Sequence, residues 1–163
     1  MLGLRLTALR TLQPLHAAAR RGLAFTPLYT AEATATGARN GKVKSSDGII
    51  DLELSVPKSM GGPGLAKSNP EQLFAAGYSA CFQGAMGAAV AQLKYPPLPS
   101  SSTVHALVSI GKGDGGFDLA VEFEVAAPGY EGERLRKVVE VAHGICPYSR
   151  ATKGNISVTT KVL

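Results

Sequence analysis

Residues 69–93, NPEQLFAAGYSACFQGAMGAAVAQL, predict one long helix around which the rest of the chain is organised. Asn69 suits the cap because its side chain can accept from free amides at a helix start. Pro70 suits the first turn because it has no amide hydrogen to leave unpaired, and Glu71 complements the helix dipole. We expect the helix to extend to the next breakers, the Pro96-Pro97 pair.

Almost every turn of this predicted helix contains Gly or Ala, so it has little polar surface and is expected to be buried. A glycine inside a helix costs about 1 kcal/mol relative to alanine, which indicates that Gly77, Gly84 and Gly87 allow close approach of neighbouring elements. Cys81 stands in the middle of the helix. It is either an inert core thiol, the commoner case for a buried cysteine, or the reactive atom of a site.

The segments on either side of the long helix alternate apolar and polar residues, which is typical of half-buried strands. Asp47-Gly48 is a strong signal for a two-residue hairpin turn. A second helix is expected over residues 131–143, stopped by Gly144, with Cys146 in a loop just after it. The predicted class is α+β, with antiparallel sheets wrapped around the long helix. We expect strands at residues 29–36, 42–45, 49–56, 103–112, 117–126 and 156–162.

Composition and charge exclude some classes of partner. The length of 163 residues suits one domain, and 45% hydrophobic with 18% charged residues is typical of a soluble globular protein. No apolar run approaches the roughly 18 residues of a membrane helix, so no membrane partner is expected. Four arginines precede the first acidic residue, Glu32, and without them the 17 Lys and Arg fall to 13 against 12 Asp and Glu. The nearly neutral remainder predicts no nucleic-acid partner.

The N-terminal segment, residues 1–27, has the composition of a mitochondrial transit peptide. It is rich in Leu, Ala and Arg and contains no acidic residue, and Leu2, Leu6 and Leu9 would share one face of a basic amphipathic helix. We predict that it is cut off between about Arg20 and Phe25, which would place the mature domain, residues 28–163, in the mitochondrial matrix of a eukaryote. A disordered tail is the alternative.

The two cysteines, Cys81 and Cys146, are more often catalytic or metal-binding than structural in a reducing compartment. A thiol fixed on a helix and a second thiol on a mobile loop suit peroxide reduction or disulfide exchange, because the first becomes a sulfenic acid and the second closes a disulfide. Cys81 lies several turns past the helix start, beyond the reach of the dipole, so a cation is needed to lower its pKa. The candidates are Arg39, on a glycine-flanked turn, and then Arg150, Lys67 and Lys153.

Several stretches of the chain resemble the organic hydroperoxide resistance proteins, a branch of the superfamily that includes the osmotically inducible, OsmC-like proteins. The resemblance covers residues 28–163 and implies an OsmC-like fold, with two sheets around central helices in an intertwined homodimer. The motifs that carry it are TATGARNG at 34–41, SSDG at 45–48, NPEQLFAAGYSACF at 69–82 and CPYSRATKGNI at 146–156.

The resemblance also implies an activity and its residues. It implies a thiol peroxidase with Cys81 as the peroxidatic cysteine and Cys146 as the resolving one. Arg39 would activate Cys81, and Glu71 would hold that arginine in place. Members of the family prefer organic and fatty-acid hydroperoxides to hydrogen peroxide and are reduced by dihydrolipoamide or lipoylated proteins, with no bound cofactor or metal.

One geometric problem follows from the predicted helix. On an unbroken helix Glu71 lies about 15 Å along the axis from Cys81, too far for both to share one arginine within a chain. Either the helix breaks near Gly77, or Arg39 and Glu71 come from the partner subunit. We favour a composite site at the dimer interface.

Rival interpretations remain at this stage. A metal site could use both cysteines and His143, but no fourth ligand is evident, and His143 is more typical of a residue that satisfies carbonyls at a helix end. A disulfide reductase would be expected to carry a Cys-x-x-Cys motif. A non-enzymatic binding module would keep both thiols buried and inert. Four side chains are candidates for contacting an alkyl chain or for plain core, namely Phe82, Tyr78, Met60 and Tyr148.

Overall fold

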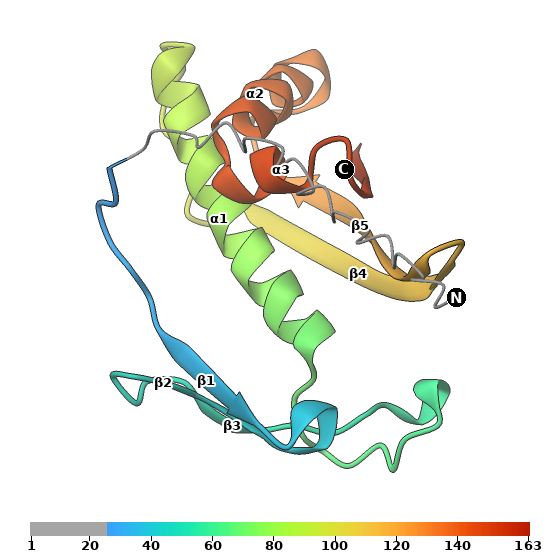
Figure 1. Cartoon of the computed structure of the whole chain (residues 1–163). Coiled ribbons are helices and arrows are strands. Elements are labelled where there is room, and N and C mark those ends of the chain that lie inside the picture. The colour runs from blue at the N-terminus through green and yellow to red at the C-terminus, as the bar shows by residue number, and fades with distance from the viewer. Residues whose placement is uncertain (1–25) are drawn as a thin grey trace, which may run out of the picture. The chain divides into compact units, whose positions relative to one another are not determined.

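The structure is a computed structural model that describes residues 26–163. The chain from Glu32 to Leu163 forms one compact unit with two three-stranded sheets and three α-helices, which is the predicted α+β class (Figure 1). Residues 1–25 lie outside the described part, so the transit peptide and its cleavage site stay predictions.

The first sheet has the order β1-β2-β3 and is antiparallel throughout. Its strands are β1 (Ala33–Thr36), β2 (Lys42–Ser45) and β3 (Asp51–Glu53), so β1 and β3 are shorter than predicted. The turn at Asp47 is confirmed, since its Oδ1 accepts hydrogen bonds from the Ile49 amide and the Ser45 hydroxyl. All four residues of β1 are exposed in the chain, so this sheet is little covered by the rest of the molecule.

A 3₁₀ turn, η1 (Ala38–Asn40), joins β1 to β2 and carries Arg39. Its flanking glycines are required by the backbone. Gly37 has a φ of 70°, and a Cβ at Gly41 would lie 1.8 Å from the Thr36 carbonyl oxygen. The arginine is therefore presented on a tightly constrained turn.

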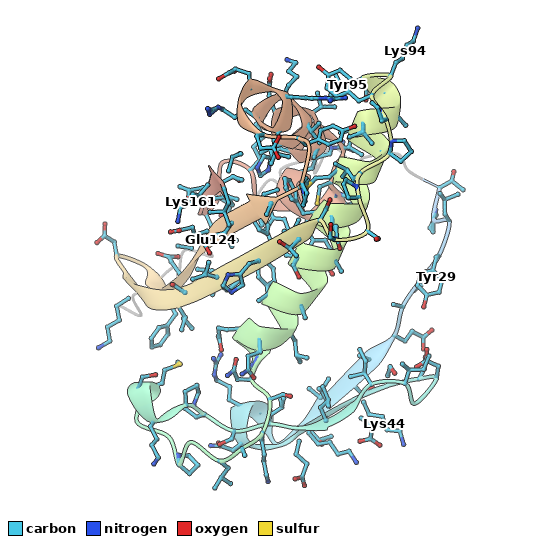
Figure 2. The ribbon with its side chains drawn as sticks, turned by 180° about the vertical axis from the view of Figure 1, so that it is seen from behind. Tyr29, Lys44, Lys94, Tyr95, Glu124 and Lys161 are labelled. Atoms are coloured by element: carbon cyan, nitrogen blue, oxygen red, sulfur yellow. The ribbon has the colours of Figure 1, made fainter. Side chains whose placement is uncertain are left out.

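The long helix is α1 (Pro70–Gln92), and it is unbroken. Its start is a capping box, in which the Asn69 side chain accepts from the Gln72 amide at 2.9 Å and the Gln72 side chain accepts from the Asn69 amide at 3.0 Å. The prediction that it extends to the prolines at 96 and 97 is wrong. The chain turns earlier because Lys94 has a φ of 54°, and the Lys94-Tyr95 turn at the end of α1 is labelled in Figure 2.

Only one face of α1 is buried within the chain. The buried residues on that face are Tyr78, Phe82, Ala85, Met86, Ala89 and Val90. Close approach occurs at Gly77, where an added Cβ would lie 3.2 Å from the Tyr148 hydroxyl, whereas Gly84 and Gly87 meet nothing within 4 Å. By length and composition alone α1 is apolar enough to cross a membrane, which the sequence analysis did not predict. The core helix of a soluble protein passes the same test, so this is weak evidence for a membrane span.

The second sheet has the order β4-β5-β6. β4 (Thr103–Gly113) and β5 (Gly116–Ala126) form the predicted hairpin, but β6 (Ser157–Val162) pairs in parallel with β5, so this sheet is mixed rather than antiparallel. Parallel pairing needs a crossover connection, which the helices between β5 and β6 supply. The outer face is polar, with Lys161 Nζ 2.9 Å from Glu124 Oε1 (Figure 2).

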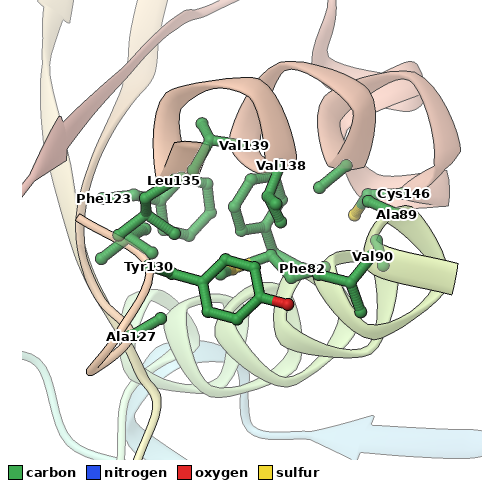
Figure 3. Packing of buried hydrophobic residues seen from close by; sticks show 14 of the residues in the cluster. Phe82, Ala89, Val90, Phe123, Ala127, Tyr130, Leu135, Val138, Val139 and Cys146 are labelled. Atoms are coloured by element: carbon green, nitrogen blue, oxygen red, sulfur yellow. The ribbon is translucent and has the colours of Figure 1, made fainter. Parts of the chain in front are cut away.

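Two helices form that crossover, α2 (Gly132–Ile145) and α3 (Pro147–Thr152). Gly144 does not stop α2, which continues through it, and the six-residue α3 was not predicted. Leu135 and Val138 of α2 pack with Phe82 of α1 and Phe123 of β5 in one apolar core (Figure 3). The Phe82 and Phe123 rings stack with their centroids 4.8 Å apart.

Candidate active site

The structure brings the two cysteines together. The Sγ atoms of Cys81 and Cys146 lie 3.4 Å apart, and both thiols are free. Cys81 is half-buried in the middle of α1, whereas Cys146 is 0% exposed and packs against α1 (Figure 3). The distance suits disulfide formation with little movement of either backbone.

The prediction that Cys146 lies on a mobile loop is wrong. It is the single residue between α2 and α3, and it belongs to the hydrogen bonding of both helices. Its amide donates to the Ala142 carbonyl at 2.8 Å, and its own carbonyl accepts from the Arg150 amide at 3.0 Å. Both thiols are therefore held in place before any reaction occurs.

The surroundings of Cys81 within one chain do not favour a thiolate. Burial raises the pKa of the Cys81 thiol above its ordinary value, and the neighbouring Cys146 raises it further. A hydrogen bond from the Tyr148 backbone lowers this pKa, but by less than burial raises it. In the described part of the chain no lysine or arginine contributes to this pKa, so the activating cation is missing from around the sulfur.

The predicted cation and its carboxylate do meet, but elsewhere. Arg39 Nη2 lies 2.5 and 2.6 Å from the two carboxylate oxygens of Glu71, and the side chains are 36% and 13% exposed. The same Nη2 is 3.9 Å from the Met60 Sδ. Because Glu71 is in the first turn of α1, this ion pair stands at the start of the helix.

The ion pair and the thiol pair are separated by a large part of α1. Ten residues of continuous helix place Glu71 about 15 Å along the axis from Cys81. The helix has no break near Gly77, so that explanation for the geometric problem is wrong. One chain thus forms two separate pairs, Arg39 with Glu71 and Cys81 with Cys146.

A cavity of about 520 Å³ adjoins the ion pair. Glu71 and Met60 line it, together with Ala106, Val108 and Ile110 of β4. Its lining is mixed, because Ser59, Asn69, Gln72 and Ser109 add polar groups, so it combines apolar side chains with several polar ones and one carboxylate.

The other predicted contacts for an alkyl chain have different positions. Phe82 and Tyr78 are both 0% exposed and belong to the core. Tyr148 is 41% exposed, and its ring stacks on Phe74 with centroids 6.2 Å apart. Met60 and Tyr148 thus remain accessible, on different parts of the molecule.

The remaining candidate cations lie away from Cys81 or face other groups. Lys67 pairs with Glu53 at 3.1 Å. Arg150 and Lys153 line a second cavity, of about 610 Å³, together with His143. Arg39 differs from Lys67 in that it contacts both oxygens of a carboxylate that is only 13% exposed, whereas Glu53 is 67% exposed.

His143 does not satisfy helix carbonyls, contrary to the prediction. Its Nδ1 is 3.1 Å from the Ser149 hydroxyl and its Nε2 is 3.0 Å from the Thr160 hydroxyl, so both ring nitrogens have protein partners. Within residues 26–163 no group of three or more His, Cys, Asp or Glu is arranged to hold a metal ion. The two hydroxyl partners of His143 were not predicted, and the sequence gives little signal for them, since Ser149 is on a short helix and Thr160 is on the last strand.

Comparison with known proteins places this arrangement in a family. The model of the OsmC-like protein family matches residues 61–161, more than half of the chain. The chain belongs to the OsmC-like family. It is 52% identical over 132 residues to an organic hydroperoxide resistance protein of Xanthomonas axonopodis pv. citri, a match that covers 81% of this chain and 92% of that protein.

Other members of the OsmC-like family extend the comparison to the fold. The organic hydroperoxide resistance protein OhrA of Bacillus subtilis is 42% identical over 137 residues, covering 83% of this chain and 96% of that protein. The crystal structure of an organic hydroperoxide resistance protein from Legionella pneumophila aligns with a TM-score of 0.78 at 38% identity, covering 84% of this chain and 98% of that one. The OsmC-like fold is thereby confirmed.

Proposed function

We propose that this protein is a cysteine-based thiol peroxidase that reduces organic hydroperoxides, including those of fatty acids, to alcohols. The observation that carries the proposal is the 3.4 Å separation of the Cys81 and Cys146 sulfurs. Two held, reduced thiols at this distance are arranged to store and release two electrons. The names of the relatives, organic hydroperoxide resistance proteins, support the choice of substrate.

The cycle proceeds in balanced steps. The Cys81 thiolate attacks the distal oxygen of R–O–OH, the O–O bond breaks, and the alkoxide takes a proton and leaves as R–OH. Cys81 is then a sulfenic acid. The Cys146 sulfur attacks the Cys81 sulfur, water leaves, and a disulfide joins the two residues. Cys81 is half-buried, so the peroxide can reach its sulfur, whereas Cys146 is buried and reacts only with Cys81.

The activating charge comes from a second subunit. In this homodimer, the Arg39–Glu71 pair of one chain faces Cys81 of the other, which places a cation beside the thiol whose pKa is otherwise raised. The free face of α1, with Gly84 and Gly87 open to contact, and the uncovered first sheet support such a partner. The cavity beside Glu71 would then hold the alkyl chain.

The disulfide is reopened by an external dithiol. The chain has two cysteines in all, and both are used in the bridge, so the reducing electrons must come from another molecule. Dihydrolipoamide or a lipoylated protein is the proposed reductant. No bound cofactor is required.

The proposed compartment is the mitochondrial matrix. The acid-free, arginine-containing segment of residues 1–27 supports this location. N-terminal sequencing of the native protein is expected to find a start near residues 20–25, and native protein that begins at Met1 would contradict the proposal.

The test of the activity is peroxide consumption by the purified protein with dihydrolipoamide. Fast turnover of an organic hydroperoxide, slower turnover of hydrogen peroxide, and loss of both in Cys81→Ser are expected. One equivalent of organic hydroperoxide should lower the intact mass of the protein by two hydrogens. Ser79→Ala is the matched control, since its hydroxyl bonds only the Ala76 carbonyl of its own helix. No turnover with either peroxide would instead favour a binding module with inert thiols.

A further inference from the structure

A buried hydroxyl, that of Ser149, connects the two helical segments that carry the cysteines. The Tyr78 hydroxyl donates to Ser149 Oγ at 3.0 Å, and His143 Nδ1 lies 3.1 Å from the same oxygen. Ser149 is 6% exposed and Tyr78 is 0% exposed. Both residues line the cavity of about 610 Å³, but so little of either side chain is exposed that water competes only weakly for their hydrogen bonds.

The spacing of these residues relates each of them to a cysteine. Tyr78 precedes Cys81 by three residues on α1, which is about one helical turn. His143 and Ser149 are six residues apart and bracket Cys146, with three residues on either side. The bond between His143 and Ser149 therefore closes the turn that contains Cys146, and the bond from Tyr78 ties that turn to the helix that contains Cys81.

The closed turn is also anchored to the second sheet. His143 Nε2 is 3.0 Å from the Thr160 hydroxyl on β6, and the His143 ring packs on Phe82 with centroids 4.5 Å apart. The Thr152 hydroxyl adds a contact to the Tyr78 hydroxyl at 3.1 Å. The network thus spans α1, α2, α3 and β6, the elements that surround the two thiols.

We propose that Ser149, held by Tyr78 and His143, is a positioning residue that keeps the Cys146 thiol against Cys81 and so determines how readily the disulfide forms. None of the three side chains is a partner of either sulfur in the described structure, so their effect is on geometry. Without the shared hydroxyl, the junction between α2 and α3 gains freedom, and the effective concentration of one thiol at the other falls. The biological role of this device depends on the proposed function, but the disulfide equilibrium does not.

The experiment is a redox titration of the full chain in glutathione buffers, with the disulfide quantified by alkylation and mass. Ser149→Ala removes two hydrogen bonds, so we expect the equilibrium constant for disulfide formation to fall about tenfold. For a two-electron couple this is a shift of about 30 mV. Tyr78→Phe keeps the ring and removes one hydroxyl, and should lower the constant about threefold.

Ser79→Ala is again the control, because it is the same substitution on α1, two positions from Cys81, and its hydroxyl has no part in the network. It should leave the equilibrium within about twofold of the wild type. A folded Ser149→Ala with the wild-type potential would overturn the proposal. If that variant fails to fold, a wild-type potential in Tyr78→Phe would overturn it equally.

A separate measurement distinguishes this proposal from the peroxidase proposal. With one equivalent of organic hydroperoxide, Ser149→Ala should form the Cys81 sulfenic acid at the wild-type rate and lose it more slowly, which a dimedone adduct would record. If wild-type protein forms neither the sulfenic acid nor the disulfide with the hydroperoxide, the peroxidase proposal fails. The shift in the glutathione titration would still support the positioning role of Ser149.

Discussion

The part of the molecule before α1 and the part from α1 onward are built differently. From Tyr78 to Cys146 the chain supplies one continuous core, to which α1, β5 and α2 each contribute large, fully buried side chains. Among the described residues before α1, only Leu54 and Ser55 are buried. The thiol pair lies in the well-buried part from α1 onward, whereas Arg39 lies in the sparsely buried part before α1. The thiol pair is thus assembled within one chain, whereas Arg39 is on a 3₁₀ turn between two strands of the little-covered first sheet.

This contrast predicts that two inactive variants will complement each other. Arg39→Ala retains Cys81 and Cys81→Ser retains Arg39, so a dimer with one of each has one intact composite site. Each variant alone should be inactive. After subunit exchange in a 1:1 mixture, half of the dimers contain one subunit of each variant, and each such dimer has one working site out of two. The mixture should therefore recover about a quarter of the wild-type activity. The measurement is peroxide consumption before and after subunit exchange.

The control for complementation is a mixture of Cys81→Ser with Cys146→Ser. Both variants lack a member of the same thiol pair, which the structure assembles within one chain. No intact thiol pair can form in that mixture, so catalytic turnover with dihydrolipoamide should not be recovered. Recovery there, or its absence with Arg39→Ala, would contradict the division of the site between subunits.

The core around the thiols should be far more sensitive to truncation than the exposed strands. Leu135 is 1% exposed on α2, and Leu135→Ala should lower the free energy of unfolding by about 2–5 kcal/mol through the cavity that it leaves. Leu107, 42% exposed on β4, is the matched control, and Leu107→Ala should cost about 0.5 kcal/mol or less if its surface is free. Urea denaturation measures both. A large cost at Leu107 would show instead that β4 is covered by a partner.

Substitutions at Gly84, on the open face of α1, test whether a second subunit packs there. A Cβ at Gly84 would meet nothing within 4 Å in the chain. Gly84→Ala should therefore stabilise an isolated subunit by about 1 kcal/mol, since alanine favours helix. If a second subunit packs on this face, the bulkier Gly84→Leu should dissociate the dimer and abolish peroxide turnover while circular dichroism stays unchanged. Urea denaturation of Gly84→Ala and sedimentation of Gly84→Leu, with Gly115→Ala in the exposed β4–β5 turn as control, separate these outcomes.

The sequence specified the local structure of this protein better than its junctions. The capped start of α1, the Asp47-Gly48 turn and the β4–β5 hairpin were predictable because each depends on neighbouring residues alone. The continuation of α2 through Gly144 was not predictable in this way. Residues 144–146 are held by helix hydrogen bonding and by contact with α1, and such tertiary contacts override the tendency of glycine to end a helix.

The candidate site was predictable to a similar degree. The residue types and the resemblance made Cys81, Cys146, Arg39 and Glu71 the candidates, and helix geometry indicated that the two pairs cannot meet in one chain unless α1 breaks, which it does not. The burial of Cys146 and the partners of His143 could not be predicted, because both depend on how α3 packs behind α1, and a six-residue helix gives almost no periodic signal.

His143 gives the smallest expected effect, a dependence of stability on pH that originates in the well-packed part of the molecule. Burial lowers the pKa of the His143 imidazole below its ordinary value, so the folded protein favours the neutral ring. The unfolded chain binds more protons as the pH falls through about 6.5, and stability must therefore decrease in that direction. His143→Gln should reduce the loss of stability between pH 7.5 and 5.5, measured as the shift in the urea midpoint.

The surroundings of His143 decide which control is informative. The ring faces the hydroxyls of Ser149 and Thr160 and the ring of Phe82, while three charged residues line the adjoining cavity, namely Glu140, Arg150 and Lys153. Thr160→Val removes one hydrogen-bond partner but keeps the imidazole, so it should keep the pH dependence while lowering stability at both pH values. If His143→Gln retains the full loss at pH 5.5, the acid sensitivity arises from other groups, and the buried network is then stabilising only through its hydrogen bonds.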